Sequence, residues 1–431
     1  MKTFNIAIVG LGNIGLEVYK NLLRNKNNIL NKTGFKLNVY KVSSKNFNKK
    51  RGNIKISKFL WEKNALNLCS DKKVDIIVEL VGGSAGIAKK LVFSALKNKK
   101  HVVTANKALI AKYGDELSIL AEKNSVNLLF EASVGGGIPI IQSIKQGLIA
   151  NQIKQIYGIL NGTTNFILTE MEKTNSSFNE ILKIAQQKGF AESNPSADID
   201  GHDVAAKISI LSSICFGSKI INKNFLVEGI RNIEIEDILF AKKLNFKIKL
   251  LAIAEKINNK IKQRVHPCLI PTHIDIANIN GVTNAIVVDG SPIGRTVYEG
   301  PGAGKGPTAS SIISDIASIM VGNDDYSFGF SPKSKKTYKL FDFSKHESKY
   351  YLRFLVSDKP GVLSAITSCL AKNNISVESL VQNPNNNYSN IVIVTHLSKE
   401  SSIKNTISIL AKNKKIFKKI VMIRVRNESK L

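Results

Sequence analysis

The sequence contains little cysteine, and no apolar run in it is long enough to span a bilayer. Only 4 of its 431 residues are cysteines, and they lie far apart without a CxxC pair: Cys69, Cys215, Cys268 and Cys369. This spacing argues against a disulfide framework and against a cysteine zinc site. Residues 1–3 lead directly into the apolar run 4–9, with no signal-peptide cleavage pattern after it. We therefore expect a cytoplasmic protein with no membrane partner.

Acidic residues are also scarce. The chain has 33 Asp and Glu against 62 Lys and Arg, which gives a formal net charge of +29 at pH 7. Such a charge is one mark of a nucleic-acid binder. The lysines, however, are scattered among asparagine and isoleucine, as in residues 25–28 and 411–415, and there is no RNP-type aromatic motif. We interpret the charge as compositional, with attraction of anionic substrates as a consequence, and we expect no nucleic-acid partner.

The length predicts two or three domains, and the first of them has an α/β pattern. The apolar strands that we predict, which alternate with helical stretches, are residues 4–9, 37–42, 75–80, 101–104 and 127–131. Strands separated by helices favour right-handed βαβ crossovers in a parallel sheet. We therefore predict a Rossmann-type nucleotide-binding domain over residues 1–130.

Two further domains follow in the sequence. Residues 131–300 predict an α+β catalytic and dimerisation domain, with helices at 178–188, 204–216 and 235–244 and strands at 249–257, 261–270 and 285–290. Residues 326–348, which contain Pro332 and several lysines, have the composition of a linker. Residues 349–431 predict a βαββαβ unit, with strands at 350–356, 376–382, 390–397 and 416–425 and helices at 362–373 and 402–412.

A glycine motif, Gly10-Leu-Gly12-Asn-Ile-Gly15, follows the first strand immediately and opens a helix. Its glycines permit a tight turn, close approach of the backbone to a pyrophosphate, and close packing of the helix on the strand. The helix N-terminus, with Asn13 and Ile14 in its first turn, would face the phosphates. The motif predicts a dinucleotide site; the alternative is a tight βα turn without a ligand.

The end of the second strand indicates which dinucleotide is bound. An NAD site needs an acid there for the ribose 2′-hydroxyl. Residues 42–45 instead read Val-Ser-Ser-Lys, and Lys49, Lys50 and Arg51 follow. Hydroxyls and cations suit a 2′-phosphate, so the sequence favours NADP(H) over NAD(H), with Ser44 and Lys45 at the phosphate. The alternative for Lys45 is a solvated surface lysine.

Thr104-Ala-Asn-Lys107 closes the fourth predicted strand. Ligands of doubly wound sheets collect beyond the carboxyl ends of strands. Thr104 and Lys107 would therefore lie beside the cofactor, and Lys107 can reach the nicotinamide or the substrate. Taken alone, Lys107 is better interpreted as an ordinary surface lysine.

Residues 189–207 gather acidic side chains in a basic chain. Four carboxylates precede Lys207: Glu192, Asp198, Asp200 and Asp203. Asp203 and Lys207 are spaced i, i+4, so a helix that begins near Gly201 would place both on one face. Carboxylates beside a lysine suit a small cationic substrate and a proton transfer. The alternative is a capped helix with a surface ion pair.

Together these segments resemble the homoserine dehydrogenase family over essentially the whole chain. The resemblance rests on the glycine motif, on Thr-Ala-Asn-Lys107 and on residues 131–139, 158–167, 189–207, 300–304 and 307–309. The segments 158–167 and 189–207 are specific to this family. The C-terminal unit resembles an ACT domain, a small regulatory fold that often binds amino acids.

The resemblance implies a reversible NAD(P)-dependent reduction of L-aspartate 4-semialdehyde to L-homoserine, in the branch toward threonine and methionine. Glu192 and Asp198 would accept the substrate ammonium group, and Asp203 would orient the substrate or a water. Lys207 corresponds to the lysine that transfers the proton. Lys107 would assist at the substrate oxygen or between substrate and nicotinamide.

The resemblance also implies further binding groups. Gly189, Gly302 and Gly304 map near the cofactor, and helix 308–320 would pack back on the nucleotide domain and add residues 301–325 to it. Backbone oxygens of Glu131, Val134, Gly136 and Ile138 would hold a monovalent cation, Na⁺; the alternative is a glycine-rich hinge without metal.

The resemblance further implies a homodimer or homotetramer. A threonine effector is expected at the turn 358–361 of the ACT-like domain, unless that domain serves only in oligomerisation. We expect no fused aspartokinase module.

Two alternatives to this function remain open. A different Rossmann dehydrogenase, acting on another amino-acid aldehyde or an imine, would keep the glycine motif but would not need Glu192, Asp203 and Lys207 together. A non-catalytic amino-acid sensor would keep only the nucleotide fold, and the presence of both Lys107 and Lys207 argues against it.

Overall fold

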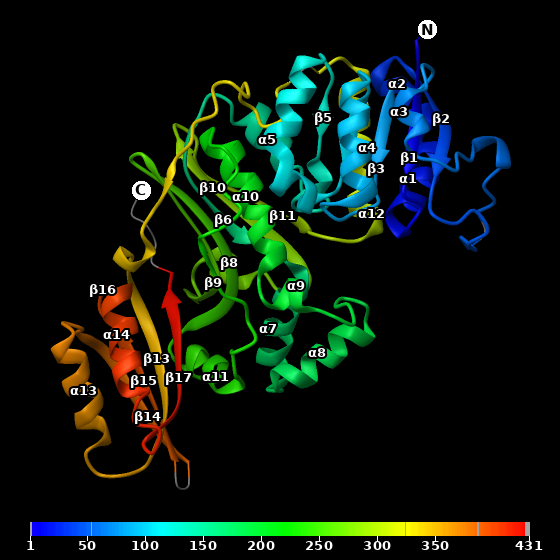
Figure 1. Cartoon of the computed structure of the whole chain (residues 1–431). Helices are drawn as coiled ribbons and strands as arrows, with labels where there is room; N and C mark the ends of the chain where they lie inside the picture. The colour runs from blue at the N-terminus through cyan, green and yellow to red at the C-terminus, as the bar shows by residue number, and fades with distance from the viewer. Residues whose placement is uncertain (1, 53, 324, 386–387, 427–431) are drawn as a thin grey trace.

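The amino-terminal part of the chain folds around a parallel sheet with the strand order β2-β1-β3-β4-β5 (Figure 1). The computed structural model describes residues 2–52, 54–323, 325–385 and 388–426. The strands of this sheet are β1 (Thr3–Val9), β2 (Lys36–Ser43), β3 (Ile76–Glu79), β4 (His101–Thr104) and β5 (Leu128–Leu129). Each strand predicted here is confirmed, but β5 is shorter than predicted because a 3₁₀ turn, η2, begins at Glu131.

Helices cover both faces of the parallel sheet. One face carries α1 (Asn13–Arg24), α2 (Lys26–Thr33) and α12 (Lys305–Met320), and the other carries α3 (Asn67–Ser70), α4 (Gly86–Lys97) and α5 (Lys107–Lys123). α12 packs against α1, where Ile312 and Ile316 share a core with Ile8 and Val18. A helix from the far end of the central part therefore completes the nucleotide-binding fold.

The central part contains a mixed sheet. Its strands are β6 (Gln152–Ile159), β7 (Leu226–Val227), β8 (Phe246–Ile257), β9 (Lys260–Pro271), β10 (Thr283–Ser291) and β11 (Gly294–Pro301). β8 and β9 form a long hairpin whose turn includes Asn258 at a φ of +51°, a conformation that asparagine tolerates better than most residues. The predicted strands 249–257, 261–270 and 285–290 are confirmed.

The helices of the central part begin where their sequences supply caps. They are α6 (Ile140–Gln142), α7 (Gly162–Thr174), α8 (Phe178–Gln187), α9 (Ser196–Ile199), α10 (His202–Phe216) and α11 (Ile235–Lys243). Ser177 and Glu180 form a reciprocal capping box at the start of α8. Gly201, at a φ of +84°, turns the chain into α10. The helices predicted in this part are confirmed to within two residues at either end.

The segment predicted as a linker, residues 326–348, is packed along much of its length. Phe328 is fully buried beside Phe130, and the Lys335 ammonium lies 2.5 Å from Asp115. β12 (Lys339–Leu340) pairs with β9, and a short turn, η5 (Phe343–Lys345), follows. These contacts tie the segment to the two preceding parts of the chain.

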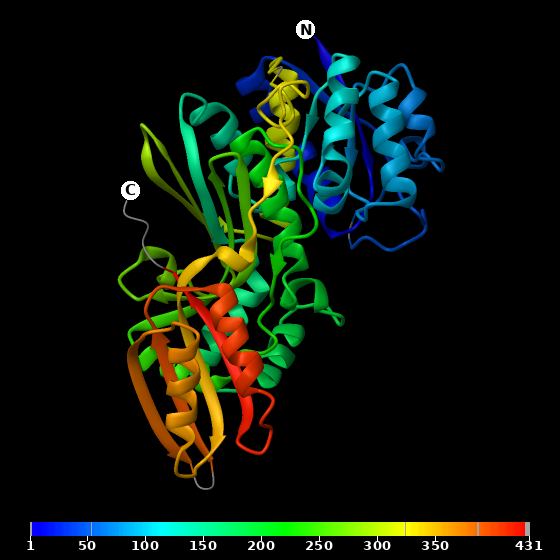
Figure 2. The same cartoon turned by 60° about the vertical axis from the view of Figure 1, so that its left-hand side comes forward.

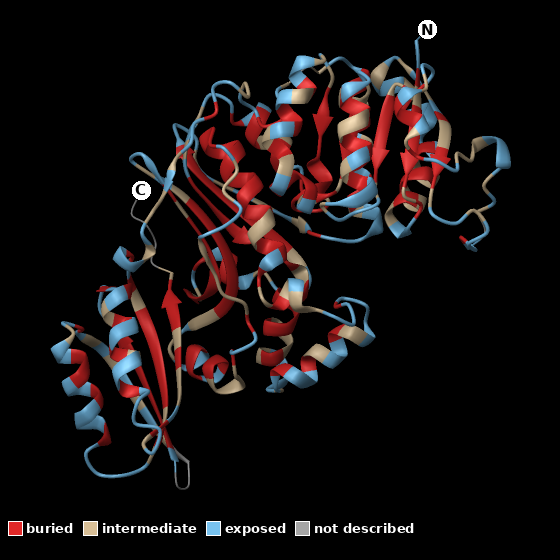
Figure 3. Cartoon of the chain, in the orientation of Figure 1, coloured by how far each residue is buried: buried red, intermediate tan, exposed pale blue. Residues whose placement is uncertain are grey.

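The C-terminal part is the predicted βαββαβ unit. It consists of β13 (Glu347–Ser357), α13 (Val362–Lys372), β14 (Val377–Asn385), β15 (Tyr388–Thr395), β16 (Ser398–Lys399), α14 (Glu400–Leu410) and β17 (Phe417–Val425). Figure 3 shows that the strands of this unit are buried and that α13 and α14, on one side of them, expose their outer surfaces. None of the helices in the described ranges has both the length and the apolar character needed to cross a membrane.

The central and C-terminal sheets are one continuous sheet, which sequence analysis did not predict. Its order is β11-β10-β6-β8-β9-β17-β13-β15-β14. The junction is parallel pairing of β17 with β9, in which Arg424 lies opposite Cys268. Figure 2 shows how β17 lies between the two parts. The C-terminal unit is therefore hydrogen-bonded to the central part.

Candidate active site

The glycine motif builds an open helix N-terminus at the end of β1. A Cβ on Gly10 would lie 2.4 Å from the Leu80 carbonyl oxygen, and one on Gly15 would lie 1.9 Å from the Gly10 carbonyl oxygen. Gly12 has no neighbouring atom within 4 Å of such a Cβ. No side chain of the described residues caps α1, whose first turn holds Asn13 and Ile14 and no acid. This space before uncapped N–H groups fits a pyrophosphate.

The end of β2 lies next to this space. The Gly10 amide donates to the Ser43 carbonyl oxygen at 2.9 Å. Ser44 follows half-buried and Lys45 is exposed. The structure therefore places Ser44 and Lys45 beside the glycine motif, on the side where the adenosine ribose of a dinucleotide lies in this fold.

Arg51, in contrast, turns inward. Its guanidinium donates to the backbone carbonyls of Asn46, Phe47 and Lys49 and lies over the Trp61 ring. Arg51 therefore shapes the loop after β2 and does not offer its charge to a ligand. Of the other cations that the sequence analysis noted after the second strand, Lys49 and Lys50 are exposed.

A buried carboxylate organises the ends of β3 and β4. Glu79, the last residue of β3, is fully buried and accepts hydrogen bonds from the Val81 and Gly82 amides at 2.8 and 3.1 Å. The Thr104 hydroxyl donates to the same carboxylate at 2.7 Å. Glu79 thus fixes the loop beyond β3 and engages the hydroxyl of the buried Thr104. Sequence analysis did not identify Glu79. The signal that could have identified it is an acidic residue at the end of a strand that is otherwise apolar.

Asn106 sets the start of α5 and so positions Lys107. Its Oδ1 accepts from the Leu109 amide, which caps the helix, and its Nδ2 donates to the Gly83 carbonyl at 2.7 Å. Lys107 is the first residue of α5. Its side chain leaves the nucleotide-binding part and reaches α10.

Two lysines and one aspartate meet at that point. The Lys107 ammonium lies 2.5 Å from Asp203 Oδ1, and the Lys207 ammonium lies 2.7 Å from Asp203 Oδ2. Lys207 also donates to the Leu160 carbonyl oxygen at 2.6 Å. The side chain of Lys107 is 42% exposed, whereas those of Lys207 and Asp203 are 10% and 6% exposed. Lys207 therefore lies at the closed side of the cluster and Lys107 at the open side.

Asn161 joins the aspartates of the cluster. Its Nδ2 donates to Asp198 Oδ1 at 2.8 Å and to Asp203 Oδ2 at 3.0 Å. Its Oδ1 accepts from the Thr164 amide at the start of α7. Asn161 is therefore both a helix cap and part of the site, two roles that sequence alone could not separate.

The surroundings set different pKa values for the charged groups. Burial lowers the pKa of Lys207, and the nearby Lys107 charge adds to this, against the attraction of Asp203. Burial also opposes the Lys107 charge, but Asp203 outweighs it and raises the pKa of Lys107. Burial would raise the pKa of Asp203, yet the two lysines hold it below its ordinary value. Lys207 is thus the lysine that releases a proton more readily.

Two of the four predicted carboxylates lie outside the cluster. Asp200 forms a two-point ion pair with Arg231, with both contacts at 2.9 Å. Glu192 is exposed at the rim, between α8 and α9, and its charge still acts on Lys107. Burial and the neighbouring Asp203 charge raise the pKa of Asp198. Asp198 and Asp203, and not all four acids, form the carboxylate pair of the site.

The remaining predicted cofactor glycines lie in loops at the domain boundary. Gly189, at a φ of +73°, follows α8, and a Cβ at this position would have no neighbouring atom within 4 Å. A Cβ on Gly136 would lie 2.4 Å from the Gly302 carbonyl carbon, so these two loops pack backbone to backbone. Gly304, at a φ of +113°, opens α12, which like α1 has no side-chain cap among the described residues.

The predicted cation loop contains backbone oxygens rather than a side-chain cluster. The Glu131 carboxylate is engaged by the Ile141 and Gln142 amides, both at 2.8 Å. The Gly136 carbonyl accepts from the Ser311 hydroxyl, and the Ile138 carbonyl accepts from the Ile140 amide. Each carbonyl oxygen keeps a second lone pair. Among the described residues no group of His, Cys, Asp and Glu could hold a metal, so the loop fits a hard monovalent cation only through main-chain oxygens.

Comparison with known proteins decides the family. Residues 10–131 match the model of the homoserine dehydrogenase NAD binding domain, residues 139–317 the homoserine dehydrogenase model, and residues 350–414 the ACT domain. The homoserine dehydrogenases of Neisseria gonorrhoeae and Helicobacter pylori are 40% and 39% identical to this chain, over 99% of it and 99% and 100% of their own lengths. The chain belongs to the homoserine dehydrogenase family.

Homoserine dehydrogenases are NAD(P)-dependent oxidoreductases, and the structure agrees with this membership. A crystal structure of the homoserine dehydrogenase from Thiobacillus denitrificans matches with a TM-score of 0.91 and 37% identity over 99% of both chains. A putative homoserine dehydrogenase from Archaeoglobus fulgidus matches with a TM-score of 0.67 and 32% identity, over 74% of this chain and 100% of its own. The resemblance, the fold class and the ACT domain deduced from the sequence are thereby confirmed.

The glycine motif of this chain can be tested with a matched pair of variants. We expect Gly12→Ala to fold with unchanged thermal stability but to raise the KM for the dinucleotide, because its Cβ enters the open space before α1. Gly15→Ala should destabilise the chain, because its Cβ would overlap the Gly10 carbonyl. Thermal unfolding and cofactor KM values measure both effects. Unchanged cofactor KM in a folded Gly12→Ala variant would contradict this placement of the pyrophosphate.

Proposed function

We propose that this chain reversibly reduces L-aspartate 4-semialdehyde to L-homoserine, with NADP(H) favoured over NAD(H) and with Lys207 as the proton donor. The proposal is supported by one observation above all. Lys207, Asp203 and Lys107 meet where the nucleotide-binding part faces α10, with both ammonium groups within hydrogen-bonding distance of the Asp203 carboxylate. The product would enter the branch toward threonine and methionine.

The substrate is an amino acid, and the carboxylates of the site suit its ammonium group. Asp198 is held by Asn161, and Glu192 lies at the exposed rim on the approach to Lys107. We infer that these two acids bind the ammonium group. Asp203 is already shared by two lysines, so its role is to orient them and the substrate or a water beside them.

The third N–H of Lys207 is the proton donor in this proposal. An ammonium group has three N–H bonds; one of them points to Asp203 and one to the Leu160 carbonyl. The remaining bond can donate to the aldehyde oxygen and pass its proton to the alkoxide. A bound NADPH supplies the hydride. Lys107, whose pKa is raised, stays charged and stabilises the developing negative charge on oxygen.

The preference for NADP(H) rests on Ser44, on Lys45 and on the absence of an acid at the end of β2. A hyperthermophilic archaeal homoserine dehydrogenase in complex with NADPH, 27% identical with a TM-score of 0.63, covers 73% of this chain and 97% of its own length. That protein's cofactor supports the same choice here.

We expect Lys45→Glu to lower kcat/KM with NADPH by roughly ten- to a hundredfold, because it replaces a charge-assisted contact with repulsion. kcat/KM with NADH should change little. Oxidation of each cofactor with aspartate semialdehyde measures both values. Lys49→Glu, an exposed lysine of the same loop, is the matched control and should leave the ratio near that of the unchanged chain. Failure of the unchanged chain to oxidise either cofactor with this aldehyde would refute the proposed reaction.

The ACT domain supports an amino-acid effector, and we propose L-threonine. The turn between β13 and α13 exposes Asp358 and contains Gly361 at a φ of +88°. We expect L-threonine to lower the steady-state rate and Asp358→Ala to weaken that inhibition without changing the rate in its absence. Equal inhibition of both proteins would place the effector elsewhere.

Two further properties complete the proposal. A Na⁺ ion would bind the main-chain oxygens of Glu131, Val134, Gly136 and Ile138, in the loop that packs on Gly302. The active chain would be a homodimer or homotetramer formed through the central part.

A further inference from the structure

A polar cavity lies where the central part joins the ACT domain, away from the site described above. Its volume is about 160 Å³. It is lined by residues of β8, β9, β13 and β17, among them Glu255, Lys262, Arg264, His266, Cys268 and Arg424. His346, between η5 and β13, and Arg426, directly after β17, also line it. Walls from both parts of the chain therefore enclose it, at the pairing of β17 with β9.

Three side chains that line this cavity keep nitrogen atoms without hydrogen-bond partners among the described residues. These atoms are Nε and Nη1 of Arg264, Nε2 of His266 and Nδ1 of His346. The three residues are only 4%, 2% and 7% exposed. Buried polar groups in proteins are nearly always hydrogen-bonded, and a charged group left without a partner is the most costly case. All three residues line the same cavity, and their unpartnered nitrogen atoms point to a ligand that is bound there.

The charge of the lining is positive. Four cations line it, Lys262, Arg264, Arg424 and Arg426, against the two acids Glu255 and Glu347. Glu255 binds Arg264 through Nη2 alone, at 2.7 Å, and lies 3.7 Å from Lys262. The Nε and Nη1 groups of Arg264 therefore remain without partners in the described part of the chain, and a guanidinium fork suits the oxygens of an anion.

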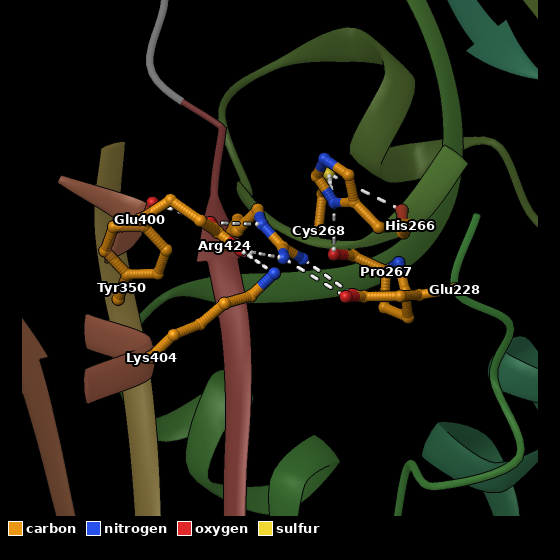
Figure 4. A network of polar contacts seen from close by, with 8 residues as sticks. All are labelled: Glu228, His266, Pro267, Cys268, Tyr350, Glu400, Lys404 and Arg424. Atoms are coloured by element: carbon orange, nitrogen blue, oxygen red, sulfur yellow. Dashed lines mark hydrogen bonds and ion pairs between the residues drawn. The ribbon is translucent and has the colours of Figure 1, made fainter. Parts of the chain in front are cut away.

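Arg424 and the histidines define the rest of the lining. The Arg424 guanidinium bridges Glu228 of the central part and Glu400 of the ACT domain (Figure 4), with contacts between 2.5 and 3.2 Å. His266 Nδ1 lies 2.9 Å from the Pro267 carbonyl, which can only accept, so Nδ1 carries the proton and Nε2 offers a lone pair. Burial lowers the pKa of His266 well below its ordinary value and that of His346 to about 3. Both rings are thus neutral. Since Arg424 is already paired with two carboxylates, the positive charge at the cavity comes from Lys262, Arg264 and Arg426.

We propose that this cavity binds a small anion, an oxyanion such as phosphate or a small carboxylate, and that the bound anion ties the ACT domain to the central part. Oxygens of the anion accept from Arg264. A hydroxyl or ammonium hydrogen of the same ligand donates to His266 Nε2. Since the ligand contacts β9 as well as the His346 side of the cavity, its binding stabilises their junction.

The test is calorimetric titration of the full chain with inorganic phosphate, sulfate, acetate and glycine, at constant ionic strength set with sodium chloride. We expect saturable binding, tighter for phosphate than for sulfate, which has no hydrogen for His266 at neutral pH. Tighter binding of acetate or glycine would assign the site to carboxylates. Crystals soaked in selenate, located by its anomalous scattering, should show the ion against Arg264.

Two variants separate this cavity from other anion sites. Cys268→Met fills the cavity without changing its charge, and Arg264→Gln removes the fork; each should weaken binding roughly ten- to a hundredfold. Arg231→Gln, which breaks an exposed ion pair with Asp200, is the matched control and should bind as the unchanged chain does. Circular dichroism checks that the variants are folded. Binding that survives Cys268→Met, or selenate found only elsewhere, would overturn the proposal.

Discussion

Replacing Lys207 with alanine is expected to lower kcat for aldehyde reduction by roughly 10²–10⁴-fold, the usual contribution of a positioned general acid. The KM for the dinucleotide should change little, because Lys207 lies on α10 and the cofactor contacts that we propose lie on the glycine-rich loops. Asp203 keeps its contacts with Lys107 and Asn161 in this variant, so the chain should still fold. Steady-state kinetics in both directions and thermal unfolding provide the measurements.

Lys404→Ala is the matched control for this variant. Lys404 and Glu400 are also a helical i, i+4 pair, but the lysine side chain is 52% exposed and lies in the ACT domain. Its removal should leave kcat unchanged. An equal loss of activity in both variants, or full activity in Lys207→Ala, would contradict the assigned role.

The pH dependence gives an independent check, and its sign follows from the lowered pKa of Lys207. Reduction needs the charged ammonium as donor, so its rate should fall as pH rises through that pKa. Oxidation needs the neutral amine as acceptor, so its rate should rise over the same interval. Both the fall in the reduction rate and the rise in the oxidation rate with pH should be absent in Lys207→Ala. A pH dependence that persists in this variant would have to come from another titrating group.

The second large effect is expected at the junction between the ACT domain and α11. Arg353 of β13 is buried and contacts Asp237 through Nε at 2.6 Å and Nη2 at 3.0 Å, and Glu234 through Nη2 at 2.6 Å. Asp237 is fully buried. Arg353→Met should therefore cost about 3–5 kcal/mol, because it leaves a buried carboxylate without its cation. Urea unfolding, followed by both circular dichroism and activity, measures the loss.

Two further variants test whether the unpaired buried carboxylate causes the loss of stability. Arg231→Met removes an arginine from an exposed pair with Asp200, and it should cost no more than about 1 kcal/mol. The double variant Arg353→Met/Asp237→Leu removes both buried charges and should recover most of the lost stability. A double variant as unstable as the single one would show that packing, not the unpaired carboxylate, was responsible.

Most of the elements could be predicted because each leaves a local pattern. Apolar runs marked β1 to β4, and the alternation of strands and helices marked the C-terminal βαββαβ unit. The continuous sheet could not be predicted in the same way. Pairing of β17 with β9 joins segments far apart in the sequence, at Arg424 and Cys268, and no local signal specifies such a partner. The domain limits themselves stay a prediction.

The site could be predicted in part for the same reason. The i, i+4 spacing indicated Asp203 and Lys207, and the strand end indicated Lys107, but only the folded chain brings the three together. Side-chain hydrogen bonds determine which of the other predicted residues can reach a ligand. Asp200 is paired with Arg231, and Arg51 donates to the carbonyls of its own loop. Such choices depend on which partners the fold places within reach.

The continuous sheet connects the ACT domain to the proposed catalytic site through a series of hydrogen-bonded strands. β17 is hydrogen-bonded to β9, β9 to β8, and β8 to β6. β6 ends at Ile159, directly before the Leu160 carbonyl that holds the Lys207 ammonium. A twist of the outer strands would therefore reach the carbonyl that holds Lys207, the proton donor that we propose. An effector bound to the ACT domain would then slow turnover without entering the catalytic site.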